Sequence, residues 1–67
     1  MPYVNIKITR ENITSIQKEE LINEVTNVLQ RVLDKNKETT FVIIDEVQTD
    51  NWGIAGEQVT KRRKQEQ

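Results

Sequence analysis

The nitrogen of Pro2 is the atom of this chain best suited to act as a general base. The sequence contains no His and no Cys, which excludes a triad histidine, a thiolate nucleophile and the usual zinc ligand sets. When the second residue is as small as proline, the initiating Met1 is ordinarily trimmed, and Pro2 then carries a free secondary amine. An α-amino group titrates at about 7.7 to 8.0, and burial lowers that pKa, so the neutral amine can accept a proton near pH 7. Met-Pro openings also occur in many unrelated proteins, so Pro2 alone does not establish this chemistry.

A short strand is predicted to position Pro2. From Tyr3 to Thr9, the apolar residues Val4, Ile6 and Ile8 alternate with more polar ones, which is typical of a half-buried strand. The proline ring restricts the terminus, so the strand that follows would aim its nitrogen.

A long helix is predicted from about Ser15 to Asp34. Thr14 and Gln17 have the spacing of a capping box, and apolar residues then recur at intervals of three and four. Asn36 is expected to adopt the left-handed conformation at the helix end.

The remaining segments are a second strand, a hairpin and a tail. Thr39–Val47 is β-branched and almost continuously apolar in its centre, as expected for a central strand covered on both faces. Residues 48–51 form a polar turn, the Gly-rich residues 52–56 belong to a C-terminal hairpin, and residues 61–67 form a polar tail.

The order strand, helix, strand predicts a right-handed β-α-β crossover with parallel strands, in the α/β (α+β) class. At 67 residues the chain forms a single domain, 1–67. Two strands and one helix leave one sheet face bare, and no disulfide is available to stabilise so small a fold. We therefore expect a homo-oligomer.

The chain resembles the 4-oxalocrotonate tautomerase (2-hydroxymuconate tautomerase) family over nearly its whole length. The resemblance implies a β-α-β subunit in a homohexamer built as a trimer of dimers, no cofactor or metal, and a Pro2 nitrogen that moves a proton on an enol or dienol acid. The segments that carry it are Met1-Pro2-Tyr3-Val4, Gln17-Lys18-Glu19-Glu20-Leu21-Ile22 with Val25, Val42-Ile43-Ile44-Asp45-Glu46 and Trp52-Gly53-Ile54-Ala55-Gly56-Glu57.

The resemblance also implies two substrate-binding residues. Trp52 falls where the family places an aromatic residue, usually Phe, that keeps the pocket dry around the proline; it could equally pack an interface between subunits. Typical members carry one Arg after the first strand and another near the start of the second. Arg10 lies slightly early for the first position and is as well explained as a solvated charge, while Phe41 occupies the second.

These departures indicate a subgroup without the usual arginines and put a dicarboxylate substrate in doubt. We expect an isomerase that interconverts the enol and keto forms of a small unsaturated 2-hydroxy or 2-oxo acid, with Pro2 as base and aromatic compound catabolism as its setting. The alternatives are a Pro2-dependent lyase, hydratase or dehalogenase, and a noncatalytic oligomeric binding protein.

Other partners are not expected. The basic run Lys61–Lys64 could contact phosphates, but the net charge is −1 and no aromatic residue interleaves with the run, so a solvated tail is favoured over nucleic acid binding. No signal peptide or membrane-spanning run is found, so a cytoplasmic protein is expected. Asp45 and Glu46 adjoin on a strand, point to opposite faces and receive no catalytic role.

Overall fold

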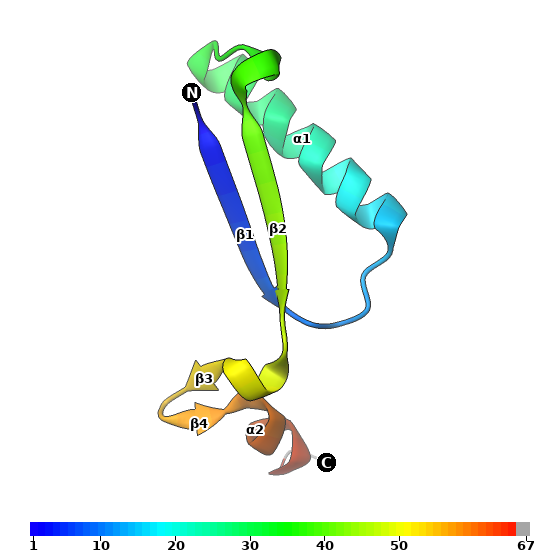
Figure 1. Ribbon diagram of the computed structural model, residues 1–67, viewed down its shortest axis with the longest axis vertical. Coiled ribbons are helices and arrows are strands. Elements are labelled where there is room, and N and C mark those ends of the chain that lie inside the picture. The colour runs from blue at the N-terminus through cyan, green and yellow to red at the C-terminus, as the bar shows by residue number, and fades with distance from the viewer. Residues whose placement is uncertain (66–67) are drawn as a thin grey trace.

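The computed structural model describes residues 1–65 and shows a β-α-β unit followed by a small hairpin and a short helix (Figure 1). The two long strands pair in parallel, so the predicted α+β class and crossover are confirmed. The elements are β1 (Tyr3–Thr9), α1 (Ser15–Leu33), the 3-10 turn η1 (Lys37–Thr39), β2 (Phe41–Val47), the 3-10 turn η2 (Thr49–Asn51), β3 (Gly53–Ile54), β4 (Glu57–Gln58) and α2 (Val59–Gln65).

The register between β1 and β2 is continuous from Tyr3 opposite Phe41 to Thr9 opposite Val47. Two further backbone bonds extend it: the Phe41 amide donates to the Pro2 carbonyl at 3.0 Å, and the Arg10 amide donates to the Val47 carbonyl at 2.8 Å. Pro2 is therefore tied to the start of β2 through its carbonyl.

The predicted start and end of α1 are confirmed, since the helix runs from Ser15 to Leu33 with Asp34 as its C-cap, but the left-handed residue differs from the prediction. The Gln17 amide donates to the Thr14 hydroxyl at 3.0 Å, and the Thr14 amide donates to the Gln17 side chain at 2.9 Å, which completes the capping box. The left-handed residue at the helix end is Asp34, with φ 53°, and not Asn36. Asn36 instead caps η1, where its side-chain oxygen accepts from the Glu38 amide at 2.9 Å.

The second strand begins at Phe41, two residues later than predicted. Thr39 belongs to η1, and the hydroxyls of Thr39 and Thr40 donate to the Asn36 carbonyl at 3.3 and 2.8 Å. These local bonds compete with the strand ladder at residues whose β-branched side chains otherwise favour it.

One sheet face is bare in the single subunit. Phe41 and Ile43 on β2 are 50% and 46% exposed, so the predicted bare face of one subunit is confirmed, while coverage of this strand on both faces stays a prediction for the assembly. Val59, at 5% exposure, is the one buried hydrophobic residue among the part of the chain that is described. The accessible surface of 5405 Å² exceeds the roughly 4,400 Å² expected for a compact monomer of this mass. The radius of gyration of 15.5 Å likewise exceeds the value of about 11 Å expected for a compact domain of this length.

The C-terminal hairpin is confirmed as β3 and β4. Its two-residue turn places Ala55 at φ 52° and Gly56 at φ 82°, the positive angles that match the twist of a tight hairpin. The segment predicted as a polar tail is polar but helical as far as Gln65, and residues 66–67 lie outside the described part. Neither α1 nor α2 combines the length and apolar character needed to cross a bilayer.

Candidate functional site

Pro2 lies at the beginning of β1 and is half-buried. Its carbonyl is fixed by the Phe41 amide, while its nitrogen is a peptide nitrogen as long as Met1 is attached. The geometry holds the residue at one end of the two-stranded sheet (Figure 1).

Trp52 lies beyond the opposite end of that sheet, after η2. Seven strand residues at 3.3 Å each separate the two ends by about 23 Å. Arg10 follows β1 directly and is also at the Trp52 end. One subunit therefore does not bring Pro2 together with Trp52 or Arg10.

Trp52 borders a hollow of about 330 Å³, which we call the Trp52 hollow. Trp52, Ile54 and Val59 supply the apolar part of its lining, and two arginines and a threonine supply the polar part. The full lining is Thr9, Trp52, Ile54, Val59, Arg62 and Arg63. A hollow of this composition suits a small ligand with one anionic end and one hydrocarbon end.

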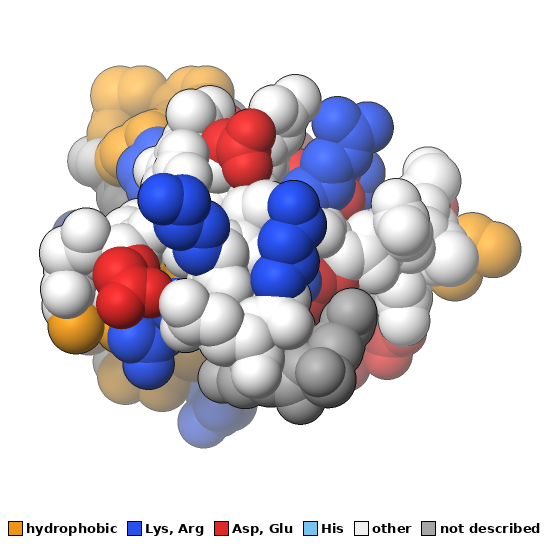
Figure 2. Space-filling view, turned by 90° about the horizontal axis from the view of Figure 1, so that it is seen from below, with side chains coloured by type: hydrophobic (Ala, Val, Ile, Leu, Met, Phe, Trp, Pro, Cys, Tyr) orange, Lys and Arg blue, Asp and Glu red, His pale blue; other side chains and the backbone are white. Residues whose placement is uncertain are grey.

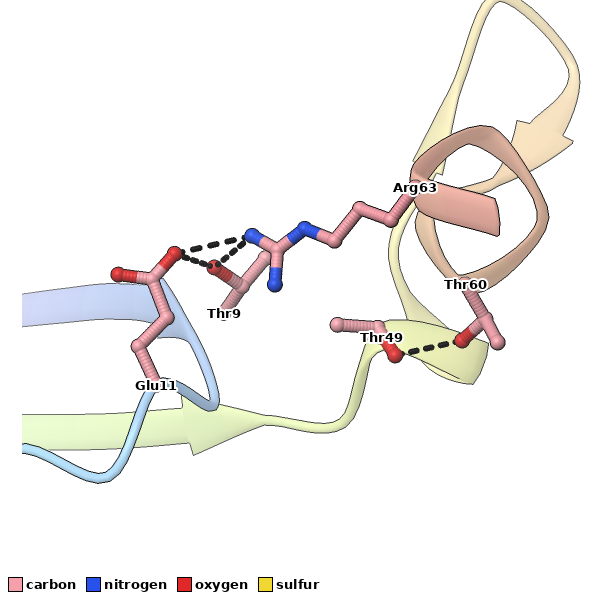
Figure 3. Close-up of polar contacts among 5 residues, drawn as sticks. All are labelled: Thr9, Glu11, Thr49, Thr60 and Arg63. Atoms are coloured by element: carbon pink, nitrogen blue, oxygen red, sulfur yellow. Dashed lines mark hydrogen bonds and ion pairs between the residues drawn. The ribbon is translucent and has the colours of Figure 1, made fainter. Parts of the chain in front are cut away.

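Arg63 is engaged in a polar cluster at the end of β1 (Figure 3). Its Nη2 donates to Glu11 Oε1 at 2.9 Å and to Thr9 Oγ1 at 3.3 Å, and the Thr9 hydroxyl donates to the same Glu11 oxygen at 2.7 Å. The Thr9 hydrogen bond, and after it Arg63, holds the pKa of Glu11 below its ordinary value. This cluster links α2 to a residue more than fifty positions earlier in the chain.

A second tie holds α2 against η2. The hydroxyls of Thr49 and Thr60 are hydrogen-bonded, as Figure 3 shows, and the Thr60 hydroxyl also contacts the Asp50 carboxylate. The Val59 amide donates to the Trp52 carbonyl at 2.8 Å. These contacts fix the first turn of α2 beside the Trp52 hollow.

Arg10 lines a different hollow, of about 340 Å³, with Asn12 and residues of η2 and α2. In one subunit Arg10 and Trp52 thus face separate spaces. The role of Arg10 in substrate binding stays a prediction.

Arg62 and Arg63 are the residues of this region that sequence reasoning missed. The sequence pattern predicts a solvated tail at these positions, whereas both residues line the Trp52 hollow. They stand three and four positions after the buried Val59, the spacing that places side chains on one side of a helix. Figure 2 shows this end of the molecule, where Lys and Arg side chains stand among acidic ones.

The carboxylates of β2 point to opposite faces, as predicted. Asp45 Oδ2 accepts from Asn5 Nδ2 and from Lys7 Nζ, each at 2.9 Å, on the bare face. The Asn5 hydrogen bond, followed by Lys7, lowers the pKa of Asp45. Glu46 instead pairs with Lys18 of α1 at 2.7 Å. Both groups are engaged in bonds that hold the sheet and the helix.

Comparison with known proteins agrees with this fold. The family model described as tautomerase enzyme matches residues 2–62. A probable tautomerase K2 of Dickeya dadantii (strain 3937) is 60% identical over 65 residues, which cover 97% of each chain.

Two solved structures show the same arrangement. DmpI from Helicobacter pylori superposes with a TM-score of 0.85 at 45% identity, covering 94% of this chain and 97% of that one. The 4-oxalocrotonate tautomerase isozymes from Methylibium petroleiphilum give a TM-score of 0.77 at 30% identity, covering 88% and 94%. The resemblance predicted from the sequence is confirmed, and the chain belongs to the tautomerase enzyme family, whose members are isomerases.

Proposed function

We propose that this chain is the subunit of a homo-oligomeric tautomerase that converts a small unsaturated acid between its 2-hydroxy (enol) and 2-oxo (keto) forms, with the Pro2 amine as general base. The observation that carries the proposal is the position of Pro2 at the head of β1 in a chain of the tautomerase family. Met1 is 85% exposed, so the bond that must be cut to free the amine is accessible.

The free amine has a defined chemical task. It takes the hydroxyl proton of the enol, the O–H electron pair forms the carbonyl, and the electrons of the C=C bond take a proton from the resulting prolinium at carbon. The ring and the hydrogen bond from the Phe41 amide to the Pro2 carbonyl keep the nitrogen in place through both steps.

The site is completed by a second subunit. Pro2 and Trp52 lie about one strand length, roughly 23 Å, apart in one chain, while Tyr3, Phe41 and Ile43 remain exposed on the bare face near Pro2. A neighbouring copy that covers this face would bring its own Trp52 to Pro2. An indole there excludes water and disfavours the ammonium form, which keeps the amine basic but unprotonated.

The test compares chains with defined termini. Chains of 67 residues and of the same sequence without Met1 can be prepared by chemical synthesis and verified by intact mass. The chain that starts at Pro2 should ketonise phenylenolpyruvate or 2-hydroxymuconate, and the chain that retains Met1 should not. Pro2→Ala, which keeps a free terminus, should lower kcat by about 10²- to 10⁴-fold. An undiminished rate in the Pro2→Ala protein would remove Pro2 from the mechanism.

A further inference from the structure

We propose that Arg62 binds the substrate carboxylate and that the Trp52 hollow accepts the anionic end of a monocarboxylate with a short unsaturated chain. The inference deepens the proposed function and rests on it for the identity of the ligand. It assigns the ligand's anchoring charge to α2, a part of the chain that the sequence pattern marked as a tail.

Arg62 differs from its basic neighbours in burial and in contacts. It is half-buried, whereas Lys61, Arg63 and Lys64 are exposed. Arg63 is already paired with Glu11 at 2.9 Å, while no carboxylate of residues 1–65 lies within 4.0 Å of the Arg62 guanidinium nitrogens. A half-buried guanidinium at the wall of a hollow offers a planar pair of donors that matches a carboxylate.

The rest of the lining favours one carboxylate and a hydrocarbon chain. Trp52, Ile54 and Val59 present apolar surface next to Arg62. A volume of about 330 Å³ is at the small end for ligand pockets and suits an acid of a few carbons. A second carboxylate would need a second cation, but the other arginine of the hollow, Arg63, is held by Glu11.

The position of Arg62 also agrees with the proposal that two subunits contribute to each site. Arg62 and Trp52 come from the same subunit and face the same hollow. The carboxylate would therefore be held by the subunit that supplies the indole, and the reacting carbon would project toward the Pro2 of its neighbour. Arg62 takes over the anchoring charge that Phe41 cannot supply.

A binding measurement tests this without turnover. Trp52 is the sole tryptophan, so its fluorescence reports on ligands in the hollow. We would titrate 2-oxopentanoate and its methyl ester into the wild-type protein and into Arg62→Gln, Arg62→Lys and Lys64→Gln. Lys64→Gln is the matched control, because it removes the same charge from an exposed position of α2.

The expected result is selective for the anion. Arg62→Gln should raise the Kd for 2-oxopentanoate by about 10- to 100-fold, the loss of a charge-assisted hydrogen bond. Arg62→Lys should recover part of the affinity, Lys64→Gln should stay within about twofold of wild type, and the ester should bind all four proteins alike.

Two results would overturn the inference: an unchanged Kd in Arg62→Gln, or equal loss of affinity for the acid and its ester. Circular dichroism and sedimentation show whether the Arg62→Gln protein is folded and assembled. If that protein does not fold, the same titrations are carried out with Arg62→Lys. Pro2→Ala separates this inference from the proposed function, because it should abolish turnover while 2-oxopentanoate still binds. Full turnover in Pro2→Ala would refute the base and leave the Arg62 assignment standing.

Discussion

Replacing Ile43 with Asp should separate the subunits and abolish activity. Ile43 lies on the bare face of β2, opposite Asn5 on β1 and two residues before Asp45. It remains 46% exposed in one subunit, where it contributes to the surface that a neighbour must cover. A carboxylate at this position would have to lose its water in the assembly, beside a second carboxylate.

The size of the effect follows from burial and charge. Complete burial of an isoleucine side chain contributes about 1.5 to 3 kcal/mol, so covering the remaining half contributes about 1 kcal/mol per copy. Burying an unpaired carboxylate costs several kcal/mol more. A total of roughly 4 kcal/mol weakens association about 1,000-fold.

Sedimentation velocity across a range of concentrations measures the loss directly. Gln30→Asp is the control, because it adds the same charge at an exposed polar position of α1. The wild type and Gln30→Asp should sediment as the same oligomer, and Ile43→Asp should sediment near the subunit mass of 7.9 kDa without ketonisation activity. An oligomer of unchanged mass in Ile43→Asp would refute the assignment of this face as the interface.

Three further predictions concern local features. Thr14→Ala removes the capping box and should lower the free energy of unfolding by about 1 kcal/mol in urea titration. Asp34→Gly should raise the same quantity by about 0.5 kcal/mol, because glycine adopts the observed φ of 53° without strain. The pKa of Glu11 is lowered from 4.5, so its cluster with Arg63 stabilises the fold above that pH and is lost as the pH falls through the lower folded value. NMR of the Arg63 side chain should show a transition below pH 4.5 that is missing in Glu11→Gln.

The β-α-β part of the fold could be predicted because its signals are local and periodic. Strict alternation marked β1, and the Thr14 and Gln17 capping pair marked the start of α1. The prediction failed at the first two residues of the second strand, Thr39 and Thr40, whose hydroxyls donate to the Asn36 carbonyl instead. Local hydrogen bonds from side chains to the backbone can outweigh the β propensity of the residues that make them.

The helix α2 was missed for a different reason. After Val59 its residues are all polar, so hydrophobic periodicity gives no signal. Its position depends on the Val59 amide bond to Trp52 and on the contact between Arg63 and Glu11, which are tertiary interactions.

The candidate site was only partly visible in the sequence. Residue type and family resemblance indicated Pro2 and Trp52, while the placement of Arg62 beside Trp52 required the path of the chain after β2. The separation of Pro2 and Trp52 within one subunit, by contrast, follows from the predicted parallel crossover, because Pro2 precedes the first strand and Trp52 comes after the end of the second.

The scarcity of buried residues has a genetic consequence. Val59 is the one buried hydrophobic residue among residues 1–65, and side chains such as Tyr3, Phe41 and Ile43 stay exposed in one subunit, so in the proposed assembly these side chains would stabilise the protein where copies meet. In a symmetric assembly one codon change alters every such contact at once, so a modest penalty per copy is multiplied by the number of subunits. Substitutions at exposed positions of the bare face, such as Tyr3 or Phe41, should consequently be as constrained as substitutions in the interior of a larger monomeric enzyme.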